Sequence, residues 1–254
     1  MRTACLLFAL TLAACADPFA AAQKADTIEA YEQYLAEHPD GRFAIQAKSR
    51  LEQLSYEKAR AEKSLEAYDA YLERFPDGAL HAKALAEREE FLFEWARATD
   101  TLAAWEKFLD EYPKAQKERR NKARNMVAVH GYREHLTIGE PVVEQVNLAE
   151  NPDGPKDGWG FSADVTNNGP ETIASLWLTI EYLDANGRAL DSREWPVVAP
   201  RFPVPMEEEH LLPMKSGETR RWFWSTGSLP DTWSQQVRLY PSRIELANQS
   251  ASKD

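Results

Sequence analysis

Apolar and aromatic side chains recur every three or four positions between about residues 20 and 130, which is the spacing of one face of a helix. One such face holds Ile28, Tyr31, Tyr34, Leu35 and His38. Prolines follow at positions 39, 76 and 113, and each ends a helix because the residue before a proline avoids the helical backbone conformation. The pattern therefore predicts short amphipathic helices that begin near residues 27, 64 and 101.

The helical pattern occurs three times, with a spacing of 37 residues. The matching segments are TIEAYEQYLAEHPDG from Thr27, SLEAYDAYLERFPDG from Ser64 and TLAAWEKFLDEYPKA from Thr101. One helix alone cannot bury its aromatic stripe, so neighbouring repeats are expected to stack and bury it jointly. The third repeat has Lys114 and Ala115 where the others have Asp-Gly, which favours a terminal repeat.

The repeated pattern, A-Y-x-x-Y-L-x-x-[HF]-P-D-G, resembles tetratricopeptide-like repeats of bacterial envelope proteins over residues 19 to about 127. Outer-membrane-assembly lipoproteins are among the proteins with such repeats. The resemblance implies a helical scaffold but no single function, because these repeats bind many unrelated partners. Tyr31, Tyr68 and Trp105 are expected to lie in the core between helices, and a ligand groove is the alternative.

From Leu136 onwards the apolar residues alternate with polar ones, as in half-buried strands. The alternating positions are Phe161, Ala163 and Val165, and then Leu176, Leu178, Ile180 and Tyr182. Residues 184–187, with the sequence DANG, predict a hairpin turn because Asn-Gly tolerates positive φ angles. Many short strands with regular turns favour an antiparallel β-sandwich.

The order V-T-N-N-G, I-E-Y-L-D-A-N-G, K-S-G-E-T-R and P-D-T-W resembles the immunoglobulin-like FxLYD family of bacterial surface and envelope domains. The matching positions are Val165, Asn167, Gly169, Tyr182, Leu183, Asp184, Gly187 and Gly217. These positions belong to strands and turns, and the family has no common catalytic site to transfer. The expected fold is thus α+β with several domains, in which a tetratricopeptide-like helical array precedes an antiparallel β-sandwich.

The first seventeen residues, MRTACLLFALTLAACAD, resemble a bacterial secretory signal peptide that ends in a lipobox. The apolar run from Ala4 to Ala14 is too short to cross a bilayer, which needs about 20 residues. The resemblance implies cleavage before Cys15 and lipidation of that residue. Because Ala16 and not Asp follows the cysteine, it implies the periplasmic face of the outer membrane, with the inner membrane as the alternative.

The sequence thereby divides into five segments. They are a signal peptide (1–14), a lipidated N-terminus with a short linker (15–18), three helical repeats (19–135), a β-sandwich (136–246) and a disordered tail (247–254). The only other cysteine, Cys5, lies in the signal peptide, so the mature chain can form no internal disulfide. The net charge of −11 argues against nucleic acid as a partner.

A search for chemistry in the sequence finds no nucleophile elbow, phosphate-binding loop or dinucleotide-binding motif. His210 beside Glu207, Glu208 and Glu209 is the nearest approach to a metal site, and a solvated acidic loop explains it better. The prediction is therefore a chain with no catalytic residues, no metal and no cofactor, which is not an enzyme.

Two surfaces are candidates for binding. The basic run after the last repeat, with Arg119, Arg120, Lys122 and Arg124, is either a solvated helix face or a docking site for an acidic partner or lipid headgroups. Trp159, Trp222, Trp224 and Trp233 are either sandwich core or a platform for sugars. The function expected is a membrane-anchored, non-catalytic scaffold for protein–protein contacts in the cell envelope, and the alternative is a peptidoglycan- or glycan-binding module.

Overall fold

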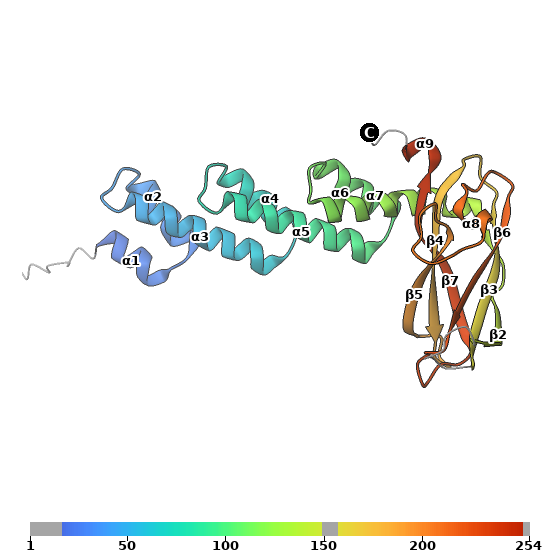
Figure 1. Cartoon of the computed structure of the whole chain (residues 1–254). Coiled ribbons are helices and arrows are strands. Elements are labelled where there is room, and N and C mark those ends of the chain that lie inside the picture. Colours follow the sequence, from blue (N-terminus) through green and yellow to red (C-terminus); the bar gives the residue numbers. More distant parts are fainter. Residues whose placement is uncertain (1–16, 149–156, 251–254) are drawn as a thin grey trace, which may run out of the picture. The chain divides into compact units, whose positions relative to one another are not determined.

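The computed structural model describes residues 17–148 and 157–250, and Figure 1 shows their helices and strands. The predicted signal peptide and Cys15 lie outside the described residues. The chain divides into two compact units, residues 1–94 and 95–254. Helices come first and antiparallel sheets follow, which confirms the predicted α+β class.

The helices recur at the spacing of the sequence repeat. They are α1 (Pro18–Ala25), α2 (Ile28–Glu37), α3 (Ala44–Glu62), α4 (Leu65–Arg74), α5 (His81–Thr99), α6 (Leu102–Glu111) and α7 (Lys117–Tyr132). The starts of α2, α4 and α6 are 37 residues apart, as predicted. Each is capped by a hydroxyl, because the side chains of Thr27, Ser64 and Thr101 accept a hydrogen bond from the backbone N–H three residues later.

The backbone between repeats is also periodic. Asp26, Lys63 and Asp100 all adopt the left-handed conformation, with φ angles of 49°, 47° and 46°. Each stands one residue before a capping hydroxyl, so a single non-glycine residue in this conformation turns the chain into the next helix. The helices α2, α4 and α6 end one residue before His38, Phe75 and Tyr112, which immediately precede the three prolines.

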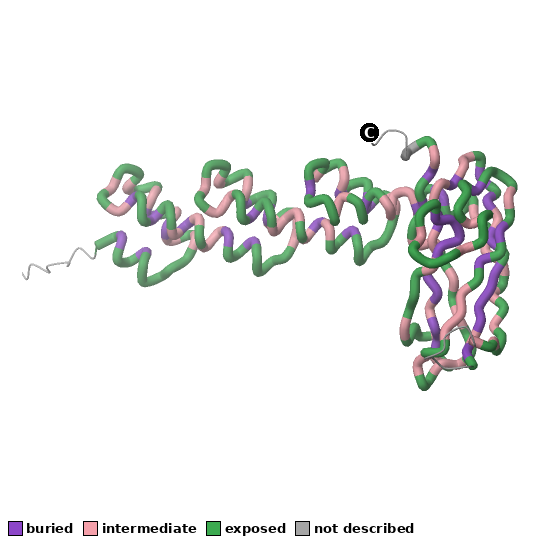
Figure 2. The backbone as a smooth tube through the Cα atoms, in the orientation of Figure 1, coloured by how far each residue is buried: buried purple, intermediate pink, exposed green. Residues whose placement is uncertain are grey.

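The aromatic stripe of the first unit is core. Tyr31 and Tyr34 are buried against Phe19 and Leu51, and a second cluster joins Tyr56, Tyr68 and Tyr71. Figure 2 shows the buried residues along these helices between exposed ones. The hydroxyl groups are satisfied by carboxylates, since Tyr56 donates to Glu87 at 2.6 Å and Tyr71 donates to Glu52 at 3.0 Å. These tyrosines therefore pack between helices and do not line a ligand groove.

The buried tyrosines predict that the first unit is sensitive to alkali. Burial, followed by the hydrogen bond to a glutamate, raises the pKa of Tyr56 and of Tyr71 above the ordinary value of 10.0. Above about pH 10 the unfolded chain loses these protons while the folded chain keeps them, so stability falls as pH rises. Circular-dichroism melts at increasing pH should show this fall, and it should be shallower for Tyr71→Phe. An equal fall in both proteins would contradict the prediction.

The second unit contains two antiparallel sheets. Its elements after α7 are a 3₁₀ turn (Arg133–His135), β1 (Leu136–Ile138), β2 (Val142–Asn147), β3 (Asp157–Asn167), β4 (Ile173–Leu183), β5 (Ala189–Val198), α8 (Glu208–Leu211), β6 (Thr219–Thr226), β7 (Gln236–Leu246) and α9 (Ala247–Ser250). In one sheet β3 pairs with β1 and β2 and with β6, and in the other β4 lies between β5 and β7. The predicted turn at residues 184–187 joins β4 to β5, with Gly187 at a φ of 77°. Helix α9 begins where the sequence predicts a disordered tail.

Both sheets contribute to one hydrophobic core. Residues Phe161 and Val165 of β3, Leu178 and Ile180 of β4 and Trp222 of β6 are fully buried in it. The alternation read from the sequence fixes this inward face. Gly169 leaves room for a side chain from the helical region, because a Cβ atom there would lie 2.3 Å from the hydroxyl of Tyr132.

Helix α7 belongs to this core. Val129 and Tyr132 are buried in the same cluster as the strands. The Tyr132 hydroxyl donates to Asn167 Oδ1 at 2.9 Å and accepts from the backbone N–H of Glu171 at 3.1 Å. The Asn125 amide donates to the Ser242 carbonyl at 2.8 Å and accepts from Ile244 N–H at 3.3 Å, so it pairs with β7 like a short strand. The last helix before the strands is thus joined to the sheets by packing and by hydrogen bonds.

Candidate functional site

A cleft of about 640 Å³ lies within the second unit between its helices and the sheet formed by β5, β4 and β7, and we call it the helix–sheet cleft. Helix α7 and the turn directly after it supply one wall with Lys122, Met126, Val129, His130 and Arg133, which follow one face of the helix. The opposite wall consists of Thr179, Ser192, Arg193, Glu194, Tyr240, Pro241 and Ser242, and Arg97, Asp100 and Trp105 complete the lining. Cationic side chains outnumber carboxylates among these described residues.

Asp100 organises one end of the helix–sheet cleft. Its Oδ1 atom lies 3.0 Å from Nε2 of His130 and accepts a hydrogen bond of 3.0 Å from the indole of Trp105. Burial alone would raise the pKa of Asp100, but these two hydrogen bonds and the positive charge of Lys122 outweigh it and hold the pKa below its ordinary value. The carboxylate is therefore ionised at neutral pH and holds both rings in place.

Sequence reasoning did not select His130 as a functional residue, although its place in the 37-residue repeat distinguishes it. It stands 37 residues after Phe93 and 74 after Tyr56, so it occupies an aromatic core position of the repeat. The signal in the sequence that could have identified His130 is its polar ring at a position that is aromatic in the earlier repeats. Its side chain is only 5% exposed and packs as those aromatic rings do, but it adds a hydrogen bond to Asp100.

The four basic residues predicted to bind a partner occupy different environments on α7. Lys122 is exposed and lines the helix–sheet cleft, whereas Arg124 is exposed outside it. Arg119 and Arg120 are half-buried, and the Nε atom of Arg120 is buried without a hydrogen-bond partner among the described residues. The structure thus places Lys122 in a cavity and brings to it Arg97, Arg133 and Arg193, which sequence reasoning did not select. Whether the predicted four bind a partner stays a prediction.

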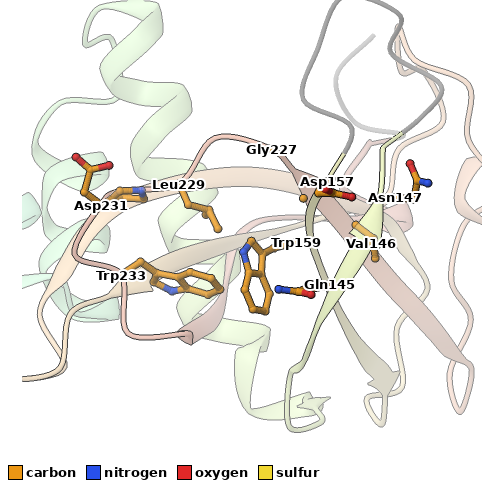
Figure 3. Close-up of a pocket in the computed structure, with 11 residues that line it drawn as sticks. Gln145, Val146, Asn147, Asp157, Trp159, Gly227, Leu229, Asp231 and Trp233 are labelled. Atoms are coloured by element: carbon orange, nitrogen blue, oxygen red, sulfur yellow. The ribbon is translucent and has the colours of Figure 1, made fainter.

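A second cavity, of about 590 Å³, lies at the start of β3, and we call it the tryptophan pocket (Figure 3). Trp159 and Trp233 form its floor, with ring centroids 5.1 Å apart and an interplanar angle of 81°. Gln145 and Asn147 of β2 and the carboxylates of Asp157 and Asp231 lie around the two indoles. Trp233 is fixed by its own indole N–H, which donates to the carbonyl of Gln236 at 2.8 Å.

The four tryptophans grouped by the sequence have separate roles. Trp222 is fully buried, and the indole of Trp224 donates to the Tyr182 hydroxyl at 2.8 Å, so these two are part of the core or pack against it. Trp159 and Trp233 are half-buried and reach the tryptophan pocket. Trp222 and Trp224 therefore fit the expected sandwich core, and only Trp159 and Trp233 are placed where the alternative, a platform for sugars, applies.

Glu207, Glu209 and His210 lie close enough to share an ion, with ligand atoms within 4.8 Å of one another. The two glutamates are exposed. Nδ1 of His210 lies 2.7 Å from the carbonyl oxygen of Val197, so a backbone contact already accounts for the orientation of the ring. Among residues 17–148 and 157–250, helices long and apolar enough to span a membrane are absent.

No protein-family model matches the sequence, and no curated protein matches it. Two solved structures show low similarity. The Pseudomonas fluorescens alkylpurine DNA glycosylase AlkC bound to DNA containing an abasic site analog is 12% identical with a TM-score of 0.29, and the match covers 87% of this chain and 62% of the glycosylase. The enzymatically active domain of bacteriophage CBA120 tailspike protein 4 is 12% identical with a TM-score of 0.14, and the match covers 44% of this chain and 19% of that domain.

The glycosylase match contradicts two exclusions made from the sequence, namely that the chain is not an enzyme and that its partners do not include nucleic acid. The first exclusion rested on missing local motifs, which do not detect catalytic groups assembled from distant positions. The second rested on net charge, which averages over local basic surfaces such as α7. Both exclusions are withdrawn. Similarity at this level assigns neither a fold nor glycosylase activity to this chain.

Proposed function

We propose that this chain is a bacterial envelope lipoprotein, anchored through Cys15 at the periplasmic face of the outer membrane, that serves as a scaffold for protein–protein contacts. The lipobox-like LAAC motif supports the anchor, and the helices that recur every 37 residues support the scaffold. In this proposal the helices are tetratricopeptide-like repeats, and the two sheets are an FxLYD-like β-sandwich.

The helix–sheet cleft is the observation that carries the proposal. Lys122 of α7 and Arg133 of the turn directly after it lie on the same face, with the apolar side chains of Met126 and Val129 between them. Lys122 and Arg133 are eleven positions apart in the sequence, which corresponds to about 16 Å along a helix. An extended segment of about five residues has that length. A partner segment with acidic side chains near both ends and an apolar centre fits this wall.

The opposite wall suits the backbone of such a segment. Ser192 offers a hydroxyl group that both donates and accepts hydrogen bonds, and the Ser242 hydroxyl, which donates to the carbonyl of Trp177 at 3.5 Å, can still accept one. Tyr240 is 39% exposed, so its ring is available for contact although its hydroxyl donates to Glu181. Basic ends on one wall and hydroxyl groups on the other give the cleft electrostatic and hydrogen-bonding complementarity to an acidic peptide.

A labelled peptide with glutamates near both ends and leucine at its centre tests the proposal in solution. We expect fluorescence anisotropy to show binding to the full chain that weakens as salt is added, because exposed charges are screened over about 10 Å at 0.1 M ionic strength. Reversing both charges, with Lys122→Glu and Arg133→Glu, should weaken binding by about tenfold or more.

Arg124→Glu is the matched control, because Arg124 is an equally exposed cation on the same helix but lies outside the cleft. It should retain the wild-type affinity. Equal losses of affinity in the double variant and in Arg124→Glu would show that the peptide binds through the overall positive charge of α7 and not through the cleft. Binding that is unchanged by added salt and by the double charge reversal would refute the helix–sheet cleft as the contact surface.

A further inference from the structure

We infer that the tryptophan pocket binds a carbohydrate, through a pyranose ring on its two indoles. The pocket volume of about 590 Å³ falls in the range of small-ligand sites. It lies in the second unit at residues that do not line the helix–sheet cleft, so the inference is independent of the proposed scaffold function.

The floor of the pocket gives the apolar part of the argument. Trp159 and Trp233 meet nearly at a right angle and form a corner of two large apolar surfaces (Figure 3). Trp233 also packs edge-on against Phe161 and Tyr182, so the hydrophobic core holds it rigidly. The C–H-rich face of a pyranose is apolar and flat, and a rigid indole face buries it at low cost in conformational entropy.

The polar groups distinguish a sugar from other small ligands. The side chains of Gln145 and Trp159 lie on directly opposed residues of β2 and β3, and those of Asn147 and Asp157 are opposed in the same way. The set mixes donors (the amides and the Trp159 indole) with acceptors (the carboxylates of Asp157 and Asp231). Sugar hydroxyls need both, because each one donates and accepts.

The indole of Trp159 is a further observation in favour of a sugar as the ligand. Its N–H group has no hydrogen-bond partner among the described residues, whereas the equivalent group of Trp233 is bonded to Gln236. A donor beside the pocket suits a hydroxyl oxygen. A cation would use the two carboxylates but would leave the indole donor of Trp159 without an acceptor. Lys, Arg and His are absent from the described residues that line the pocket, so an anionic ligand lacks a counter-charge there.

The test uses three neutral trisaccharides, cellotriose, maltotriose and triacetylchitotriose, with the full chain. Saturation-transfer difference NMR and tryptophan emission should report binding of at least one of them, with a dissociation constant of about 1 mM or lower. Gln145→Ala should weaken that binding by about threefold to tenfold, because one hydrogen bond to the ligand is lost. Trp159→Phe should weaken it as well, because the phenyl ring keeps part of the apolar face but lacks the indole N–H donor.

Glu144→Ala is the matched control for Gln145→Ala. The two residues are neighbours on β2, both are exposed, and their side chains point to opposite faces of the strand. This control should bind the trisaccharide as the wild type does. Failure of all three sugars to bind at millimolar concentration would overturn the inference. Equal losses in Gln145→Ala and Glu144→Ala would overturn it too, as would selective binding of tetramethylammonium, a simple cation, in place of the sugars.

Discussion

Replacing Tyr132 with alanine is expected to lower the free energy of unfolding of the second unit by about 4 kcal/mol, as truncation of a large buried aromatic residue does. Tyr132 is 5% exposed in the core shared by α7 and the two sheets. Its loss opens a cavity and leaves the backbone N–H of Glu171 and the amide oxygen of Asn167 without this hydroxyl partner. Urea unfolding followed by tryptophan fluorescence would measure the change, because all eight tryptophans lie in residues 95–254.

Tyr132→Phe separates the contribution of the buried ring to stability from that of the hydroxyl group. It keeps the ring in the core and removes only the hydroxyl, so the expected loss is about 1–2 kcal/mol. A loss below about 1 kcal/mol for Tyr132→Ala would mean that α7 does not share the core of the sheets. The boundary between helices and strands would then fall at residue 135, as the sequence pattern suggests.

Replacing Cys15 with alanine is expected to abolish lipidation and release the chain from the membrane fraction or leave an uncleaved precursor. A mature lipoprotein carries several acyl chains, and each buried methylene contributes about 0.8 kcal/mol to membrane binding, so the anchor is nearly irreversible while it is present. Membrane fractionation and mass spectrometry of the N-terminus would show the change. Normal cleavage with firm membrane attachment in Cys15→Ala would refute the lipoprotein assignment.

Cys5→Ala is the control for this experiment. Both cysteines lie in the first seventeen residues, but only Cys15 follows the Leu-Ala-Ala sequence of the lipobox. Cys5→Ala should therefore be lipidated and fractionate as the wild type does. Loss of the membrane form in both variants would point to a damaged signal sequence and not to a missing lipid acceptor.

The parts of the fold that follow local rules were predictable from the sequence. Helix starts follow from capping hydroxyls such as Ser64, helix ends from the prolines, and the β4–β5 turn from Asn186-Gly187, because each signal acts within a few residues. The attachment of α7 to the sheets was not predictable. Asn125 and Tyr132 contact residues 35 to 119 positions away, and nothing local to a basic helix indicates such partners.

In the candidate sites, too, the contacts between residues far apart in the sequence were not predictable. Sequence reasoning selected Lys122 with three neighbouring cations, but the arginines that join it in a cavity, Arg97, Arg193 and Arg133, come from α5, β5 and the turn after α7. It also grouped four tryptophans, of which alternation in β6 could have assigned Trp222 to the buried face. The pairing of Trp159 with Trp233 depends on the loop before β7, whose path is not encoded by a periodic pattern.

Photo-crosslinking in living cells tests the scaffold proposal most directly. A benzophenone amino acid would replace Tyr240, a 39% exposed aromatic residue in the helix–sheet cleft, and in a matched strain Phe223, a 49% exposed aromatic residue of β6 outside it. The proposal predicts a protein adduct at position 240 alone, joined through an acidic segment, and its loss when Lys122→Glu and Arg133→Glu are added. Adducts of equal yield at both positions, adducts only with lipid or nucleic acid, or no adduct at position 240 would contradict it.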